Sequence, residues 1–468
     1  MMRLGLMVLV VSLVSCVHDL GRREKDRTTY WHAWYEKGHK IGWLQTSVRR
    51  LAGGYEFERR GQLTTEMMGE LTTVTPYSLV RTTSDFALRE FESGMSAKGH
   101  DYRARGMVKN GHLVMTAGGK TQPQRVELDI SGVVYPTDAL PMLAIAKAWA
   151  VNTKHEVIAF DPMIQKSCRA EIVVLGTERI NLRDTLRHAI KLSARLFEVP
   201  HMVWIDSTGA VLREESPPSS VTILEPPELA QAVSAGTSAP DLMTLFAVAP
   251  DRRLDNPRQI GYLKIELGGI DARALRLGDE SQEIVSDSPV VVAISPARPP
   301  KTICPIPVKG ETTATGPTLV VQSGSKEILR KAQELTTGAV TAEAAARRIN
   351  DWVFRNVKQQ GTPSIPSALD VLHWMAGDCN EHAVLYAALC RAIGIPCQIC
   401  VGLVYRDGYF WYHAWNKVYV GGWVPVDPTF GQFPVDATHI KLVEGEIEEQ
   451  ARVLNVVGSL SIRVLEAR

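Results

Sequence analysis

The sequence predicts an α+β protein in which an antiparallel β-rich region precedes a C-terminal core of helices and strands. Residues 27–235 contain short runs of alternating apolar and polar residues separated by tight turns, a pattern typical of antiparallel strands. After about residue 318 the apolar residues recur at helical spacing. Strand patterns return at 397–405, 409–420 and 423–427, and helices followed by antiparallel strands indicate an α+β core.

The β-rich region is expected to form a curved, partly open antiparallel sheet with one buried face. Asn110-Gly111 lies between two apolar runs and is the strongest short hairpin signal in the chain. The apolar pattern of residues 138–152 predicts a helix packed on this sheet. The region contains no group of residues that points to catalysis.

Composition and proline content divide the chain into four parts. Residues 1–16 are expected to be a lipoprotein-type signal peptide, and residues 27–235 form the β-rich domain. Residues 250–310 combine a small strand-rich block with a proline-rich linker. Residues 318–468 are expected to form the domain that carries the chemistry.

The first sixteen residues are typical of an export signal. Arg3 precedes an apolar run that is too short to span a bilayer. Residues 13–16, Leu-Val-Ser-Cys, resemble a bacterial lipobox, in which the cysteine becomes the lipid-bearing first residue. The alternative is an ordinary signal peptide with a chance cysteine. Lipidation of Cys16 predicts a protein anchored in the bacterial cell envelope, and Val17 favours the outer membrane, facing the periplasm.

Charge and cysteine content exclude other classes of partner. The chain has 52 basic and 51 acidic residues and no long basic run, so no nucleic-acid partner is expected. Its seven cysteines do not have the spacing of a small disulfide scaffold. Cys397 and Cys400 form a C-x-x-C pair, but no second pair or suitable histidine follows, so strand packing is favoured over metal binding. No metal or cofactor is expected.

Cys379 is the candidate nucleophile because the residues around it predict the start of a helix. Gly377 and Asp378 precede an apolar helical pattern, and Asp378 with Glu381 resembles a capping box. Cys379 would then be the first helical residue, where the positive end of the helix favours a thiolate. Free backbone N–H groups at that end are able to form an oxyanion hole.

His413 and Asp427 are the candidate partners of Cys379. His413 follows the cysteine by 34 residues in an aromatic strand, and Asp427 follows His413 by 14 residues. Taken singly, the three are more simply a buried thiol, a packed strand residue and a turn residue. Together they form a nucleophile, a base and an orienting carboxylate in the order of a catalytic triad.

Strand register provides a check on this triad. A two-residue turn at Gly421-Gly422 would place Asp427 opposite Asn416, on the sheet face that His413 does not share. A three-residue loop at 420–422 would instead place Asp427 opposite Trp415, on the same face as His413 and within cross-strand reach. The triad therefore predicts the three-residue loop.

These motifs resemble the bacterial transglutaminase-like core. The similar segments are Gly-Asp-Cys-Asn-Glu-His-Ala around Cys379, Arg-Ala-Ile-Gly-Ile-Pro at 391–396, His-Ala-Trp at His413 and Val-Asp-Pro-Thr at Asp427. The resemblance covers about residues 320–445. It implies a papain-like fold in which Cys379 is the nucleophile, His413 the general base and acid, and Asp427 the orienting carboxylate.

Nearby residues carry weaker expectations. Glu381 and His382 are expected to cap or support the helix rather than to act on substrate. Animal transglutaminases use an earlier tryptophan to stabilise the oxyanion, but neither Trp352 nor Trp374 clearly matches that position. His439 lies beyond the motifs and receives no role.

The predicted activity is acyl transfer on amide or peptide carbonyls through a Cys379 thioester. Resolution by water would make a peptidase or amidase, and resolution by a lysine would make a cross-linking enzyme; hydrolysis is slightly favoured. The substrate is expected to be a protein or peptide of the cell envelope. The alternative is a membrane-anchored binding or adaptor lipoprotein without catalysis that uses its β-rich domain.

Replacing Cys16 by serine tests the anchor. Each buried CH₂ of an acyl chain contributes about 0.8 kcal/mol to membrane binding, so Cys16→Ser is expected to move the protein from the membrane to the soluble fraction. Fractionation of cells that express the full chain measures the shift, with Cys304→Ser as the control. Membrane partitioning that does not change in Cys16→Ser would contradict lipidation.

Overall fold

The computed structural model describes most of the chain and divides it into two compact units, between Asp241 and Leu242. The predicted leader and Cys16 lie outside the described residues. Each unit is considered by itself. The described residues are 22–24, 27–67, 70–97, 100–118, 124–130, 132–232, 241–361, 367–445 and 447–468.

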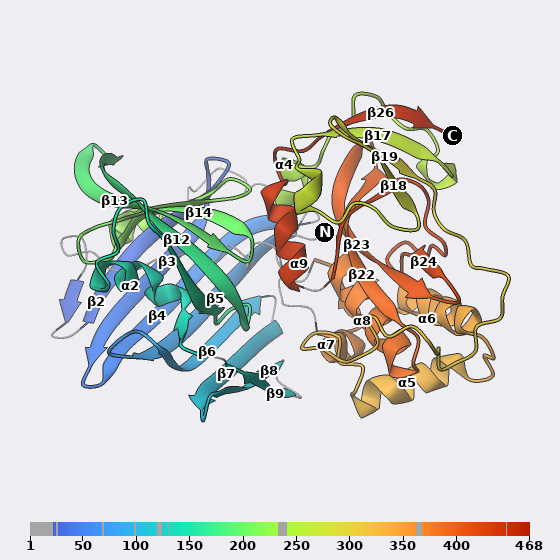
Figure 1. The fold of residues 1–468 in the computed structure, drawn as a ribbon, viewed down its shortest axis with the longest axis horizontal. Helices are drawn as coiled ribbons and strands as arrows, with labels where there is room; N and C mark the ends of the chain where they lie inside the picture. The colour runs from blue at the N-terminus through green and yellow to red at the C-terminus, as the bar shows by residue number, and fades with distance from the viewer. Residues whose placement is uncertain are drawn as a thin grey trace. The chain divides into compact units, whose positions relative to one another are not determined.

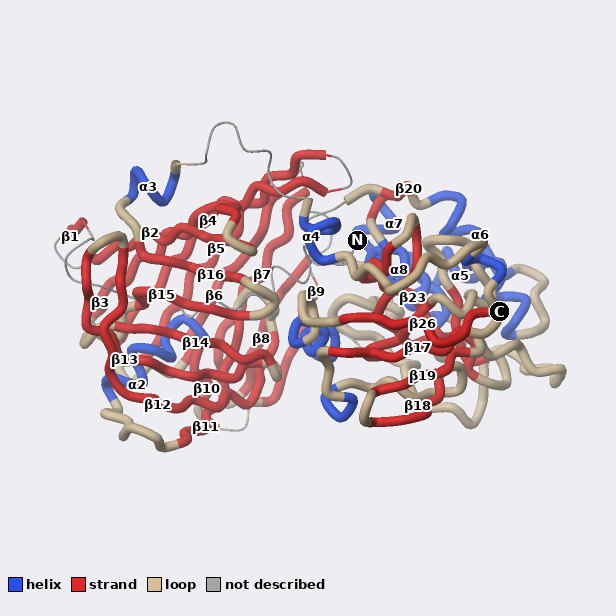
Figure 2. The backbone as a smooth tube through the Cα atoms, turned by 90° about the horizontal axis from the view of Figure 1, so that it is seen from above, coloured by secondary structure: helices blue, strands red, loops and turns tan. Residues whose placement is uncertain are grey.

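The N-terminal unit is built on one 16-stranded sheet, which confirms the predicted antiparallel β-rich region. The strands follow the order β10 to β16, then β2 to β9, with β1 beside β2. Neighbours are antiparallel except β10 and β11. Figure 2 shows how this sheet curves. Its strands are β1 (Arg22–Glu24), β2 (Arg27–Glu36), β3 (His39–Leu51), β4 (Gly54–Met67), β5 (Glu70–Thr83), β6 (Leu88–Ala97), β7 (His100–Lys109), β8 (His112–Gly118), β9 (Gln124–Asp129), β10 (Val134–Pro136), β11 (Lys154–Asp161), β12 (Lys166–Leu182), β13 (Thr185–Leu196), β14 (Val199–Ile205), β15 (Val211–Ser216) and β16 (Ser220–Leu224).

The predicted hairpin at Asn110-Gly111 is confirmed. Lys109 pairs with His112, and the two turn residues have φ values of 50° and 81°. Both values lie in the left-handed region that asparagine and glycine tolerate best, as a two-residue hairpin turn requires. The turn therefore sets the register between β7 and β8.

The helix predicted at 138–152 is shorter than the sequence pattern suggests. A 3-10 turn (Thr137–Ala139) leads into α2 (Leu140–Ala146), and Ala148 then adopts a φ of 48°. The Trp149 ring stacks on His155 of β11 at a centroid distance of 4.4 Å. This contact favours an early end to the helix and a turn into the next strand. One further short helix, α3 (Pro227–Gln231), follows β16.

The C-terminal unit contains a small antiparallel sheet in the order β18-β19-β17-β26. The first three strands confirm the strand-rich block: β17 (Leu263–Gly268), β18 (Gln282–Asp287) and β19 (Val290–Ile294). The fourth, β26 (Ser461–Ala467), comes from the other end of the unit and was not predicted. This pairing joins the segments 250–310 and 318–468 in one compact unit.

The second sheet of this unit packs against helices, as the α+β pattern predicts (Figure 1). Its order is β24-β23-β22-β25, all antiparallel. Its strands are β22 (Cys397–Arg406), β23 (Tyr409–Tyr419), β24 (Trp423–Val426) and β25 (His439–Glu444). The helices are α5 (Lys326–Thr336), α6 (Ala342–Asn356), α7 (Ala368–Trp374) and α8 (Cys379–Ala392), with short α4 (Leu242–Phe246) and α9 (Ile447–Ala451) elsewhere.

Helix α8 lies at the centre of this unit. It contacts α5, α6 and α7 as well as β22 and β23. Every residue from Cys379 to Arg391 is buried, so the helix has no solvent-facing side over that span. Thr341 is the N-cap of α6, and its side chain accepts a hydrogen bond from the Ala344 N–H at 3.1 Å. The packing around α8 fixes the position of Cys379.

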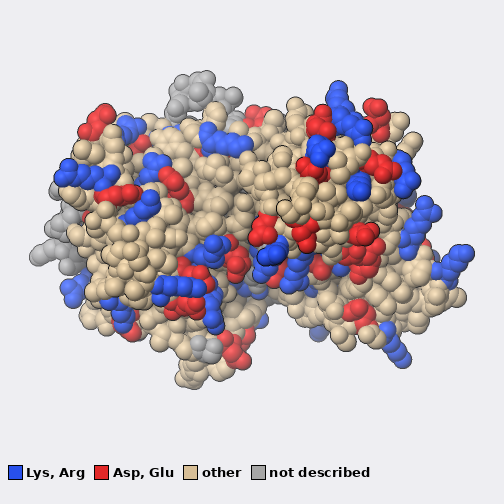
Figure 3. Space-filling model, turned by 45° about the horizontal axis from the view of Figure 1, so that its top comes forward, with Lys and Arg blue, Asp and Glu red and all other residues tan. Residues whose placement is uncertain are grey.

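The distribution of charged side chains on the surface agrees with the balanced number of acidic and basic residues. Figure 3 shows basic and acidic side chains interspersed on the visible face. Among the described residues, no helix has the length and apolarity that crossing a membrane would require.

Truncating Ile265 tests whether the small sheet supports the C-terminal unit. Its side chain is fully buried in β17, between β19 and β26. Ile265→Ala is expected to lower the free energy of unfolding by about 2–5 kcal/mol. Urea unfolding followed by circular dichroism measures the change, with the less buried neighbour Lys264→Ala as control. Equal stability of the two variants would contradict this role.

Candidate active site

The start of α8 confirms the predicted capping box. The Asp378 Oδ1 atom accepts a hydrogen bond from the Asn380 N–H at 2.7 Å, and Glu381 Oε2 accepts one from the Asp378 N–H at 2.9 Å. Glycine is required at 377, because a Cβ there would lie 2.2 Å from the Glu381 Cβ. Cys379 is therefore the first helical residue, as predicted.

The turn between β23 and β24 has the three-residue loop that the triad predicts. Tyr419 pairs with Trp423, so residues 420–422 form the loop, and Gly421 has a φ of 101°. Asn416 pairs with Val426. The next residue, Asp427, therefore lies opposite Trp415 in register and on the face that carries His413.

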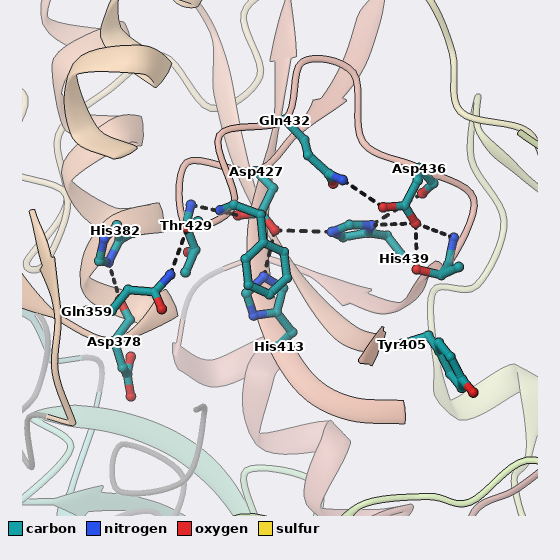
Figure 4. A network of polar contacts seen from close by, with 12 residues as sticks. Gln359, Asp378, His382, Tyr405, His413, Asp427, Thr429, Gln432, Asp436 and His439 are labelled. Atoms are coloured by element: carbon teal, nitrogen blue, oxygen red, sulfur yellow. Dashed lines mark hydrogen bonds and ion pairs between the residues drawn. The ribbon is translucent and has the colours of Figure 1, made fainter. Parts of the chain in front are cut away.

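Asp427 and His413 form a buried hydrogen-bonded pair. The His413 Nε2 atom donates to Asp427 Oδ2 at 2.8 Å, and both side chains are almost fully buried (Figure 4). The other carboxylate oxygen accepts the backbone N–H groups of Thr429 at 2.7 Å and Phe430 at 3.1 Å. The Phe430 ring stacks on His413 with a centroid distance of 4.8 Å. These contacts fix the imidazole plane and commit Nε2 to the carboxylate, so Nδ1 is the nitrogen available to a reacting group.

Cys379 lies beside the strand that carries His413. The backbone of Ala414, the residue after His413, lies close enough to the sulfur to lower the pKa of the thiol in part. Among the described residues, no hydrogen bond joins Cys379 to His413. Catalytic hydrogen bonds are often long before substrate binds, so this separation is compatible with a triad.

The pKa shifts of Cys379 and His413 favour a neutral pair rather than the expected thiolate. Burial, and secondly the negative charge of Asp378, raise the pKa of Cys379 well above its usual value. Burial also lowers the pKa of His413, although Asp427 opposes that shift. The resting pair is therefore a thiol and a neutral imidazole. Burial and the charge of Asp378 oppose the effect that the helix end has on the thiol.

His439, which received no role from the sequence, shares the carboxylate of Asp427. Its Nε2 atom lies 3.1 Å from Asp427 Oδ2, and its Nδ1 atom lies 3.3 Å from the Asp436 carbonyl oxygen and 3.6 Å from Asp436 Oδ1. Burial lowers the pKa of His439, but the hydrogen bonds and charges of both aspartates outweigh it and raise the pKa to about 9. Figure 4 shows Asp427 between the two imidazoles.

The position of His439 depends on a strand that the sequence analysis did not predict. The loop after Asp427 carries the chain from β24, at one edge of the sheet, to β25, at the other. His439 is the first residue of β25 and pairs with Val404 of β22. No motif or spacing marks this contact. The short sequence Ile-Lys-Leu-Val at 440–443, rich in strand-forming residues, is the one local signal that could have indicated the strand.

His382 supports the helix start, as expected. Its Nδ1 atom lies 2.6 Å from the Asp378 carbonyl oxygen and its Nε2 atom 3.2 Å from that of Val357. Both ring nitrogens are thus directed at backbone oxygens, one in the first turn of α8 and one just after α6. Burial lowers the pKa of His382, while the two backbone carbonyls oppose that shift. His382 ties two helices together rather than acting on the thiol.

The cysteine pair of β22 does not form a shared binding site. Residues three apart in a strand point to opposite faces, so Cys397 and Cys400 diverge. Cys400 packs with Trp415 and Val435, whereas Cys397 lies beside Cys390 of α8. Among the described residues, the one group with metal-ligand spacing is His413, Asp427 and His439, whose ligand atoms lie within 4.8 Å of one another. The hydrogen bonds of both histidines to Asp427 account for the short distances among these three side chains.

Comparison with known proteins identifies part of this unit. Residues 330–428 match the model of the transglutaminase-like superfamily, and this segment includes Cys379, His413 and Asp427. A stretch of 143 residues is 27% identical to kyphoscoliosis peptidase from Mus musculus and covers 27% of this chain. It covers 21% of that relative, so the match spans about a fifth of the relative's length.

Two solved structures show weaker similarity. A candidate cysteine protease from Cytophaga hutchinsonii is 19% identical with a TM-score of 0.31, over 43% of this chain and 83% of that one. A β-barrel-like protein of a domain of unknown function from Brucella abortus is 13% identical with a TM-score of 0.35, over 44% of this chain and 97% of that one.

Acid titration tests the contribution of Asp436, the second partner of His439. Burial raises the pKa of Asp436, but His439, Arg258 and Thr438 outweigh burial and hold that pKa below its usual value. A carboxyl whose pKa is lowered on folding stabilises the protein above its unfolded pKa of about 4, and this stabilisation is lost as pH falls. Asp436→Asn is therefore expected to cost about 1–3 kcal/mol at pH 7 and progressively less below about pH 4.

Urea unfolding at a series of pH values measures this difference. The control is Asp407→Asn, an exposed carboxyl 3.0 Å from Arg406, which should change stability little at any pH. A cost of Asp436→Asn that stays constant down to pH 3 would show that the charge of Asp436 does not contribute.

Proposed function

Because residues 330–428 form a transglutaminase-like domain, we propose that this protein is a cysteine enzyme that transfers acyl groups from amide or peptide carbonyls. One observation carries the proposal: the buried His413–Asp427 pair, on the strand beside the sulfur of Cys379. Cys379 at the start of a buried helix beside such a sheet supports a papain-like arrangement of the core.

The reaction begins from the neutral thiol and imidazole. His413 Nδ1 accepts the thiol proton as the Cys379 sulfur attacks the carbonyl carbon of the substrate. The tetrahedral intermediate collapses when the carbon–nitrogen bond breaks, and His413 returns the proton to the departing amine. A thioester on Cys379 and a free amine result. Asp427 holds the Nε2–H tautomer and stabilises the imidazolium that forms between these steps.

The capping box limits which backbone groups stabilise the oxyanion. The Asn380 N–H donates to the Asp378 side chain, and the capping box also occupies the Glu381 N–H. The Cys379 N–H is then the helix-end donor nearest the sulfur. We assign it to the oxyanion, where the positive helix end adds to its effect.

Hydrolysis of the thioester is favoured over transfer to a lysine. The sequence-related mouse protein is named a peptidase, which supports water as the final acceptor. We further propose that the lipobox-like residues 13–16 anchor the enzyme in the bacterial cell envelope, on the periplasmic face of the outer membrane. Its substrates would then be proteins or peptides of that compartment.

Acylation by p-nitrophenyl acetate, a thiol-reactive ester, tests the nucleophile. Mass spectrometry of wild type should show one acetyl group on Cys379, which Cys379→Ala cannot acquire. His413→Ala should slow acylation by about 10²-fold or more, because the general base is lost. Circular dichroism checks that both variants are folded.

The control is Cys304→Ala, which removes a free and partly exposed cysteine outside the proposed site. This variant should be acylated at Cys379 at the wild-type rate. If wild type reacts at Cys379 no faster than His413→Ala does, the enzyme proposal fails. The non-catalytic binding function would then be favoured.

A further inference from the structure

The carboxylate of Asp427 accepts hydrogen bonds from two histidines, whereas a catalytic triad requires only one histidine beside its carboxylate. Both His413 Nε2 and His439 Nε2 are directed at the same oxygen, Oδ2. The two rings lie 6.0 Å apart, centroid to centroid, at 60° to each other. His439 is therefore close enough to influence the charge of His413 while making no contact that the triad itself needs.

We propose that His439 is a positioning residue that stays positively charged and, through the shared carboxylate of Asp427, keeps His413 a neutral base. The proposal rests on the acyl-transfer function proposed above. His439 acts through Asp427 and does not touch the reacting atoms.

The hydrogen-bond geometry, with a carboxylate on either side of the ring, favours a doubly protonated His439. A neutral imidazole has a lone pair on one of its nitrogens. Here each ring nitrogen faces an acceptor: Nε2 faces the Asp427 carboxylate, and Nδ1 faces the carbonyl and carboxylate of Asp436. A lone pair at either nitrogen would oppose an oxygen. The imidazolium, with an N–H at both positions, satisfies both sides.

An alternating row of charges extends from this imidazolium to the edge of the site. Arg258 Nη1 donates to Asp436 Oδ2 at 2.6 Å, and Gln432 Nε2 donates to the same oxygen at 2.8 Å. The row is then Arg258, Asp436, His439, Asp427 and His413. The four charges of the first four groups sum to zero, so protonation of His413 would leave a net positive charge in this buried row.

The other side of His439 adds little net charge. A small cavity there is lined by His439, Trp415 and the ion-paired groups that follow. Lys441 lies 2.7 Å from Asp279, and Lys417 lies 2.6 Å from Glu444 and 3.6 Å from Glu280. Lysines and acids therefore compensate each other, and the two aspartates bonded to His439 dominate its electrostatic surroundings.

The consequence for catalysis is a limit on the basicity of His413. Protonation of His413 would place a second positively charged ring beside the Asp427 carboxylate, which is already paired with His439. The charge of His439 therefore opposes protonation of His413. This keeps His413 neutral at mildly acidic pH and helps it return the proton to the leaving amine. Without the charge on His439, Asp427 would favour protonated His413 and remove the base at low pH.

Titration of the two rings by NMR tests this directly. In the full-length protein with ¹³C-labelled histidine, we expect His439 to stay protonated from pH 5 to pH 8. His439→Gln keeps a donor for Asp427 but removes the charge, and should raise the titration midpoint of His413 by about one pH unit. The control His112→Gln, which replaces a partly exposed histidine 2.7 Å from Asp129 in the other unit, should leave that midpoint unchanged.

Acylation of Cys379 by p-nitrophenyl acetate provides the second measurement. In His439→Gln the low-pH limb of the rate should shift upward by the same amount, while the rate at pH 8 stays within a few fold of wild type. A purely structural role would lower the rate at every pH without moving the midpoint, and would overturn the proposal. An unchanged His413 midpoint in His439→Gln would also overturn it.

The outcome is separable from that of the proposed function. If wild type shows the expected histidine titrations but Cys379 is not acylated, acyl transfer fails. In that case the electrostatic coupling of His439 to His413 stands. Alternatively, Cys379 is acylated more slowly in His413→Ala, as described above, but the titration midpoint of His413 is the same in wild type and in His439→Gln. In that case only the positioning role of His439 fails.

Discussion

The ionised carboxylate of Asp427 is the group on which the candidate site depends. Burial of an unpaired carboxylate costs several kcal/mol, so the charge is retained only because four donors surround it. The Thr429 and Phe430 N–H groups bind one oxygen, and His413 and His439 share the other. Loss of any one donor leaves one of the buried oxygens with a single partner. The tautomer of His413 and the fold of the loop are thus stabilised by the same group.

The small strand-rich block stabilises this site from outside the family-matched segment. Arg258 binds Asp436 and the Tyr405 carbonyl oxygen, and the Ala437 N–H donates to the Ile260 carbonyl at 2.9 Å. Gln282 of β18 binds the backbone of Lys441 through both its amide oxygen and its amide nitrogen. These contacts hold the loop that carries Asp436 and the strand that begins at His439. A segment first interpreted as a block and linker is therefore part of the support of the site.

The sequence predicted most of the local geometry, because that geometry depends on neighbouring residues. The capping box at Asp378, the register that places Asp427 on the face of His413 and the Asn110-Gly111 turn all follow from spacings of a few residues. The end of α2 was not predictable in this way, because the Trp149–His155 stacking belongs to a tertiary contact. The upward shift in the pKa of Cys379 was not predictable for a similar reason: sequence reveals the helix end but not the extent of burial.

The sequence by itself therefore indicated the candidate nucleophile, base and orienting acid, since each is tied to a helix start or a strand pair. Only the tertiary structure decided how these groups are charged. His439 and Asp436 reach Asp427 through β25, which joins the far edge of the sheet, and Arg258 arrives from a segment that precedes the nucleophile by more than a hundred residues. Charges interact through space, and burial sets their strength, so neither the partners nor the protonation of His413 can be derived from local order along the chain.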